Sequence, residues 1–455
     1  MLAFVKSLLR PLLLPSIYVG TFLVGLLSLF KDAKYGFFLM VYLVPQANLW
    51  HKMQSYPFGK DILDIIFFSI LIGCFLQGKS RVKLSGGKYI ILSLIYGYFS
   101  LWVSTFLFSF PPPITRAHPY LADFKNYVEM FLLYFLAAWV LKNEREQRIA
   151  VWIICGVLLL IAVRDYRNFD PGAVFRWERR SVGPFYAVNL GPNHMGAFFA
   201  DYLPVMLGLF FFESSWRSRL VLMATLLFGL HPLLFSFSRG AYVAALAVLL
   251  VFGVLKKRLL LIFAFVIVVL WQTVLPPSVV NRLQMTVTSE GRIEHSAGGR
   301  LWLWGLAYHA FLEHPLFGSG WGGYSKSVAG QVDETGIELG ETQDPHSIYM
   351  RVLSEQGIVG VVLFVVVLAT SFRSGWRLFR TAELPFHKGL GLGFIGCVVS
   401  MVVTNAFGDR WSYFLLGGYY WILWGLVDRV LSNLAVQSSN QTNVALPATQ
   451  VHKSA

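Results

Sequence analysis

The residues best suited to chemistry in this sequence lie in one polar block between residues 300 and 360. The block contains arginine, histidine and many glycines, in the order Arg300-Leu-Trp302, His314-Pro-Leu-Phe-Gly-Ser-Gly320, His346 and Gly357-Ile-Val-Gly360. A neutral imidazole can accept a proton from a hydroxyl, and a guanidinium fork fits phosphate well. The residue types therefore indicate proton transfer beside an anion-binding site.

His346 is expected at the start of a helix. Asp344-Pro345-His346 reads as an N-cap aspartate followed by proline and histidine in the first turn. The positive end of a helix lowers the pKa of an imidazole, which keeps it neutral and able to act as a base. Gly357 and Gly360 would allow another helix to approach closely. The alternative is an interfacial histidine that only anchors this helix.

Two arginines are further candidates. Arg239, in Ser236-Phe-Ser-Arg-Gly240, lies at the outer end of an apolar segment, where it is either functional or a snorkelling anchor. Arg300 is expected at the N-terminus of an amphipathic helix on the membrane surface, where oxyanions are favoured. The glycines at 318, 320, 322 and 323 predict a flexible turn after this helix.

The elements that must position these residues are membrane helices. The chain has 455 residues, of which 56% are hydrophobic and 14% charged, and its mean hydropathy is +0.59. Apolar runs long enough to cross a bilayer recur throughout, which predicts an all-α polytopic membrane protein with about 12 transmembrane helices. The predicted segments are 12–30 (with a possible break near Pro11 and Pro15), 34–49, 61–77, 88–110, 124–142, 149–164, 193–213, 217–235, 239–255, 258–275, 350–373, 388–406 and 411–430.

Basic short loops predict the orientation. Five of them alternate along the chain, at 79–83, 142–148, 216–219, 256–258 and 373–388, and the positive-inside rule makes that side cytoplasmic. The net charge of +14 is therefore attributed first to cytoplasmic anchoring, and no nucleic acid is expected as a partner. The outer side receives the loops 50–60, 111–123, 165–192 and 276–346.

The predicted organisation is one transmembrane domain over residues 1–434, with the long outer loop at 276–346 inside it. Residues 435–455 are polar and are expected to form a disordered cytoplasmic tail. Cys74, Cys155 and Cys397 are scattered in apolar segments and are interpreted as core residues.

The outer loop 165–192 is unusually rich in arginine. With its flank it carries Arg164, Arg167, Arg176, Arg179 and Arg180 against three acidic residues. Because an outer loop should be poor in arginine, either the topology is shifted here or the loop binds an anion.

Taken together, the motifs resemble the O-antigen ligase / O-antigen polymerase superfamily over roughly residues 180–365. The resemblance rests on these stretches: Gly183-Pro-Phe, Asn189, Asn193-His-Met-Gly-Ala197, Ser238-Arg-Gly240, Arg300-x-Trp302, His314-Pro-Leu-Phe-Gly-x-Gly320 and His346-x10-Gly357-Ile-Val-Gly360.

This resemblance implies a fold similar to the GT-C glycosyltransferases and an active site on the periplasmic face of the bacterial inner membrane. It implies transfer of a glycan from an undecaprenyl-pyrophosphate carrier, with inversion and without metal or other cofactor. The implied catalytic residues are His346, Arg239 and Arg300. Asn193 and His314 are further candidates for binding the pyrophosphate or glycan, and Arg176, Arg179 and Arg180 are added from the arginine-rich loop, which no motif of the family aligns.

Three functions stay open at this point. The first is an O-antigen ligase that joins the glycan to lipid A–core. The second is a polysaccharide polymerase or a protein O-oligosaccharyltransferase, which uses the same donor with a growing glycan or a protein as acceptor. The third is a transporter whose arginines line an anion path.

Overall fold

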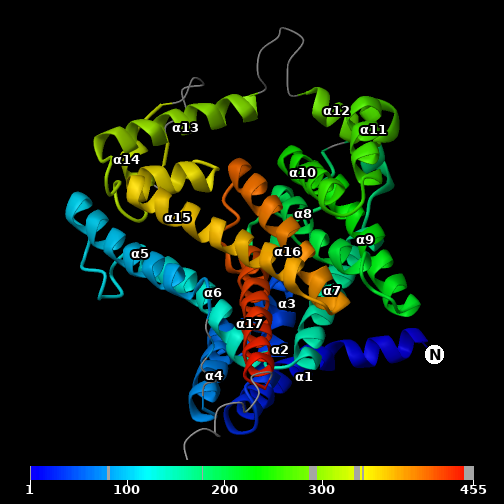
Figure 1. The fold of residues 1–455 in the computed structure, drawn as a ribbon. Helices are drawn as coiled ribbons and strands as arrows, with labels where there is room; N and C mark the ends of the chain where they lie inside the picture. Colours follow the sequence, from blue (N-terminus) through cyan, green and yellow to red (C-terminus); the bar gives the residue numbers. More distant parts are fainter. Residues whose placement is uncertain are drawn as a thin grey trace, which may run out of the picture.

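The computed structural model describes residues 2–78, 82, 84–176, 178–285, 295–332, 339–340 and 343–444. Over these residues the chain forms α-helices, short 3-10 turns and loops (Figure 1), as predicted for an all-α protein. The long helices are α1 (Leu2–Phe30), α2 (Lys34–Leu43), α4 (Ile62–Leu76), α5 (Gly87–Phe108), α6 (Leu121–Val140), α7 (Glu144–Arg167), α8 (Pro192–Phe210), α9 (Trp216–Phe235), α10 (Arg239–Leu255), α11 (Leu259–Val274), α13 (His295–Glu313), α15 (Ile348–Thr381), α16 (Pro385–Thr404) and α17 (Phe414–Val444). The short helices are α3 (Ala47–Met53), α12 (Pro277–Gln284) and α14 (Gly323–Val328), with 3-10 turns η1 (Gly59–Asp61), η2 (Pro171–Val174), η3 (Gly183–Val188) and η4 (Asn405–Phe407).

The predicted apolar segments fall on helices, except that segment 34–49 is divided between α2 and α3 with a break at 44–46. Five helices are long and apolar enough to cross a membrane by themselves, namely α5, α7, α9, α15 and α16. A sixth candidate is the pair α11 and α12, which is bent by 101° at its break. The chain is therefore a helical membrane protein. Helix α1 runs through Pro11 and Pro15 without the break considered from the sequence.

The core is richest in aromatic side chains on α17. Trp421 and Trp424 are fully buried and contact Phe131 and Tyr134 of α6. Helices α8 and α16 form another close pair, and α10 packs on the same side of α16. These contacts fix the ends of α8, α16 and α17, which are needed for the site described below.

The predicted outer loop 276–346 contains α12, α13 and α14. Figure 1 shows α13 (yellow-green) extended above α15 (yellow), and contacts between the two helices confirm that they pack together. Helix α13 buries Leu303, Ala307 and Ala310 on one face. Its other face leaves Leu301 and Leu312 about half exposed, at 50% and 52%, which suits a helix in contact with lipid.

Helix α15 is broken at Gly357, where φ is +61°. The segment that follows α13 fills the break. Backbone amides of Ser319 and Gly320 donate to the carbonyls of Ser354 and Glu355 at 2.8 Å. The amide of Ile358 donates to the carbonyl of Pro315 at 2.9 Å. Backbone groups that the broken helix cannot pair are thus satisfied by the neighbouring loop.

The glycines at this contact differ from their predicted roles. A Cβ on Gly318 would lie 2.3 Å from the carbonyl carbon of Glu355, and one on Gly357 would lie 2.5 Å from the oxygen of Leu316. Gly318 is therefore part of a tight backbone contact rather than a flexible turn. Gly357 admits this loop instead of another helix.

The C-terminal part also departs from the sequence prediction. Helix α17 continues to Val444, ten residues past the predicted end of the domain at 434. Residues 445–455 of the expected disordered tail lie outside the described residues.

Candidate functional site

Four distant segments meet around a cavity of about 570 Å³ below α13. These segments are the start of α8, the middle of α13, the loop before α15 and the loop between η4 and α17. The lining residues that carry polar chemistry are Asn189, Asn193, His194, Arg300, Gln343, Asp344, His346, Asp409, Arg410 and Tyr413. His346 and Arg300 were predicted from sequence to act together, and the structure brings them to this one cavity.

His346 lies just before α15 rather than in its first turn. The helix begins at Ile348 with Ser347 as the N-cap, and His346 has a left-handed backbone with φ of +52°. Asp344 is therefore not the helix cap, and its carboxylate instead accepts the His346 amide at 2.5 Å. The indole nitrogen of Trp304 on α13 donates to the carbonyl of Pro345 at 3.0 Å. These two bonds hold the histidine at the cavity wall.

The surroundings of His346 lower its pKa below 6.5. Partial burial is the main cause, and the positive charges of Arg300 and Arg410 act in the same direction, while Asp344 opposes them. The ring remains 55% exposed to the cavity. The sequence argument for a neutral imidazole thus reaches the right direction, although burial and two arginines are its main causes.

Arg300 lies in the second turn of α13, which begins at His295. The expected position at the helix N-terminus is therefore wrong, because the N-terminal amides are one turn away from it. Its side chain contributes a guanidinium to the cavity instead. Arg300 and His346 line the same cavity, and the positive charge of Arg300 contributes to the lowered pKa of His346.

Arg410 is a cavity residue that the sequence reasoning missed. It is 5% exposed, its Nη1 donates to the carbonyl of Asp409 at 3.1 Å, and its Nε has no hydrogen-bond partner among the described residues. Burial lowers its pKa to about 10. A Cβ on Gly408 would lie 2.1 Å from the Nη1 of Arg410, so only glycine leaves room for the guanidinium there.

Asp409 connects this loop to α15. Its carboxylate accepts from Nη1 of Arg351 at 2.9 Å and from the amide of Ser412 at 2.9 Å. Arg351 also pairs with Glu355, one turn further along α15, at 3.3 Å. The charge of Asp409 is therefore largely engaged with Arg351, and Arg410 keeps its charge available to the cavity.

A second group of arginines lies beside the cavity. The Arg180 pKa is lowered to about 10, first by burial and then by the charges of Arg282, Arg239 and Arg300. Arg180 donates to the Asn193 side-chain oxygen at 2.6 Å and to the Ser236 carbonyl at 2.8 Å. Like charges gathered in this way are costly by themselves and become favourable when an anion binds among them.

Of the remaining predicted site residues, some lie at the cavity and others lie away from it. Arg239 is the first residue of α10 and belongs to the arginine group, but it is not part of the cavity wall. Asn193 lines the cavity, and Arg180 bonds to it. Arg179 pairs with Asp170 in a neighbouring hollow, Arg176 is exposed, and His314 ends α13 away from the cavity.

Two missed residues had a signal in the sequence. His194 directly follows the predicted Asn193, and its ring meets Tyr413 edge-on at 5.6 Å between centroids. Arg410 belongs to Gly408-Asp409-Arg410, a charged step between two apolar segments on the predicted outer side. Charged residues at the end of an apolar segment, on the same predicted membrane side as His346, could have been added to the candidate site residues.

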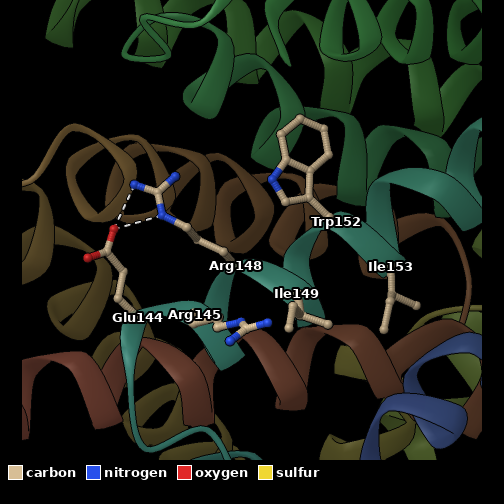
Figure 2. Close-up of a pocket in the computed structure, with 6 residues that line it drawn as sticks. All are labelled: Glu144, Arg145, Arg148, Ile149, Trp152 and Ile153. Carbon is tan, nitrogen blue, oxygen red and sulfur yellow. Dashed lines mark hydrogen bonds and ion pairs between the residues drawn. The ribbon is translucent and has the colours of Figure 1, made fainter. Parts of the chain in front are cut away.

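A larger hollow, of about 640 Å³, lies at the start of α7. Figure 2 shows that its wall comes from one helix, from Glu144 to Ile153, and that Arg148 pairs with Glu144 there. The shortest contact between the two side chains is 2.7 Å. None of the predicted site residues lies in this hollow.

Comparison with known proteins agrees with the motifs. The family model described as O-antigen ligase matches residues 221–365. An O-antigen ligase from Salmonella typhimurium is 24% identical over 296 residues, covering 60% of this chain and 70% of that protein. Both comparisons support the resemblance to the O-antigen ligase superfamily that the motifs indicate.

The part matched by the superfamily model includes Arg239, Arg300 and His346, but the cavity extends beyond it. Arg180, Asn193 and Arg410 lie outside residues 221–365. In the structure, the matched region meets α8 and the loop before α17 at this cavity.

Proposed function

We propose that this protein is an O-antigen ligase-type glycosyltransferase that moves a glycan from undecaprenyl pyrophosphate to lipid A–core. The observation that carries the proposal is the single cavity that joins His346 to Arg300 and Arg410 in a chain that resembles this superfamily. A base beside paired guanidiniums suits a reaction in which a hydroxyl attacks while a pyrophosphate leaves.

In this reaction the acceptor hydroxyl attacks the anomeric carbon of the donor glycan, and its proton passes to the neutral imidazole of His346. The bond between that carbon and the pyrophosphate oxygen breaks, so undecaprenyl pyrophosphate leaves with the bonding electrons. Attack from the face opposite the leaving group inverts the anomeric configuration. The lowered pKa of His346 keeps the base unprotonated at neutral pH.

The arginines stabilise the leaving group. Negative charge grows on the pyrophosphate as the sugar departs, and Arg300 and Arg410 face the cavity in which this occurs. Arg239 and Arg180 stand beside it and raise the positive potential. Guanidinium groups replace a metal ion in this proposal, so transfer should persist in excess EDTA. A strict requirement for a divalent metal would refute that part.

The proposed placement is a single domain of about 12 spans, similar to the GT-C glycosyltransferases, with the cavity facing the periplasm. The support comes from the cavity wall, whose segments 189–194, 299–303, 339–346 and 407–413 all lie at predicted outer ends of helices. Cysteines introduced at Gln343 and Arg145 should react with an impermeant thiol reagent from opposite sides of sealed vesicles. Labelling of both from one side would contradict the orientation.

A deletion strain tests the acceptor. Loss of an O-antigen ligase leaves bare lipid A–core while carrier-linked polymer accumulates. Loss of a polymerase would instead leave single repeats, and loss of a protein O-oligosaccharyltransferase would leave intact lipopolysaccharide with unmodified glycoproteins. A transporter would move its substrate into proteoliposomes without forming a glycosidic bond. The last three results would each replace the proposed function.

A further inference from the structure

A further hollow, of about 440 Å³ and distinct from the one at the start of α7, lies directly beside the candidate active site. It is formed by the start of α3, the end of α7 with the residues just after it, and the segment 179–184. At ~30 Å³ for each water in the liquid, the space would hold roughly 15 water molecules, which is far more than an ordinary buried water site. The hollow is large enough for a small polar ligand.

The wall carries amide groups that are not used by the protein. Gln46 is 1% exposed, lines the hollow, and its amide nitrogen has no hydrogen-bond partner among the described residues. A buried donor without a partner costs free energy, which a bound acceptor would recover. Asn48 and Asn168 lie on the same wall and are exposed to it.

Most charges around the hollow are already engaged. Asp165 interacts with His231 Nδ1 at 3.0 Å and accepts from the Ser181 hydroxyl at 2.8 Å. Asp170 pairs with Arg179. Arg164 is exposed and is the one lining arginine whose guanidinium has no hydrogen bond or ion pair among the described residues. The site thus offers amides and one available guanidinium rather than a strong charge.

This combination fits a sugar residue. Ring hydroxyls both donate and accept, so they match amide and guanidinium groups, and Phe169 and Ile161 supply apolar surface for the ring face. A bare phosphate would instead be expected where two or more guanidinium groups line one space, as Arg300 and Arg410 do in the neighbouring cavity.

Arg180 links this hollow to the active-site cavity. It lines the hollow, while its Nη2 bonds to Asn193, which lines the cavity around His346. One side-chain pair therefore separates the two spaces. A glycan whose reacting end lies beside His346 could place a further sugar in the hollow.

We propose that the hollow lined by Gln46, Asn48 and Arg164 is a saccharide subsite for the glycan chain whose end reacts at His346. The proposal rests on the transferase function above. The sugar belongs either to the donor glycan or to the acceptor glycan, which share this chemistry. The subsite adds binding affinity without contacting the reacting atoms.

The test compares Arg164→Ala and Asn48→Ala with Arg167→Ala, in purified full-length protein reconstituted into lipid nanodiscs. Arg167 is exposed at the same end of α7 but does not line the hollow, so it is a matched control. Each substrate is varied while the other is saturating. Loss of one good hydrogen bond should raise one KM about tenfold with little change in kcat, because binding to ground and transition states weakens equally.

A raised KM for the donor assigns the sugar to the donor chain, and a raised KM for the acceptor assigns it to the acceptor. Unchanged KM values for both substrates in Arg164→Ala and Asn48→Ala would overturn the subsite. Direct binding of the free glycans, released from each substrate by mild acid, is measured in parallel by saturation-transfer NMR. Glycan binding that depends on Arg164 without transfer by the wild type would refute the transferase and retain the subsite.

Discussion

The cavity around His346 and the hollow at the start of α7 are similar in size but differ in how their arginines are held. Arg148 in the α7 hollow pairs with Glu144 one turn away and lies over the Phe386 ring at 4.4 Å. Arg410 in the other cavity is buried, with an Nε that has no partner among the described residues. A hollow with satisfied charges is an ordinary surface feature, whereas a buried cation facing a cavity points to an anionic ligand.

The two regions also differ in where their residues come from. Residues 144–153 are neighbours on one helix and would be grouped in any helical fold. The cavity around His346 requires α8, α13, α15 and the loop before α17 to converge. Convergence of distant segments on unpaired charge is therefore the better sign of a site. If this difference matters for function, substitutions in the cavity around His346 should affect glycan transfer, and substitutions in the α7 hollow should not.

The largest effect is expected from His346→Ala. Removal of the proposed base should lower kcat by about 100-fold or more, measured as glycan transfer by the purified protein. His309→Ala is the matched control, because His309 is an exposed histidine on the neighbouring helix α13 and does not line the cavity. Transfer by His346→Ala at the level of this control would contradict the assigned role.

Arg410→Gln should follow, with a loss of about 100-fold in kcat, because one donor to the developing charge is removed. Arg429→Gln serves as the control, since Arg429 is also buried, at 8% exposure, but lies outside the cavity wall. Size-exclusion profiles and thermal midpoints separate misfolding from lost catalysis. A folded Arg410→Gln protein with near wild-type turnover would show that the buried guanidinium is structural.

The pH dependence of glycan transfer should report the pKa of His346 and the charges around it. Transfer requires unprotonated His346, whose pKa lies below 6.5, so kcat/KM should be level near neutral pH and fall as the pH drops through that pKa. Asp344→Asn removes the group that raises this pKa, so the acid limb should move to lower pH. Arg300→Gln removes a group that lowers it, so the limb should move to higher pH. If the acid limb moves in the opposite directions, or does not move, it does not report the protonation of His346.

The sequence predicted the helices well because apolar length is a local property. His346, Arg300 and Asn193, which were selected by their motifs and by the predicted membrane side, line one cavity in the structure, while their roles stay predictions. The break of α15 at Gly357 was not predicted, because it depends on backbone partners that lie 35 to 43 residues earlier in the chain. Arg410 was missed for a similar reason, since only the fold shows that it reaches the cavity.

The smallest effect is expected in the α7 hollow. Arg148→Ala removes a half-exposed i,i+4 ion pair, worth roughly 0.3–0.5 kcal/mol, together with its contact to Phe386. The thermal midpoint in detergent should fall slightly, and transfer should be unchanged across the full pH range. The Arg145 side chain, beside it on the same helix, has no hydrogen bond or ion pair with the described residues, so Arg145→Ala should leave both properties unchanged. A strong loss of transfer in Arg148→Ala would mean that this hollow also serves the reaction, and that a compensated charge does not mark a region as inert.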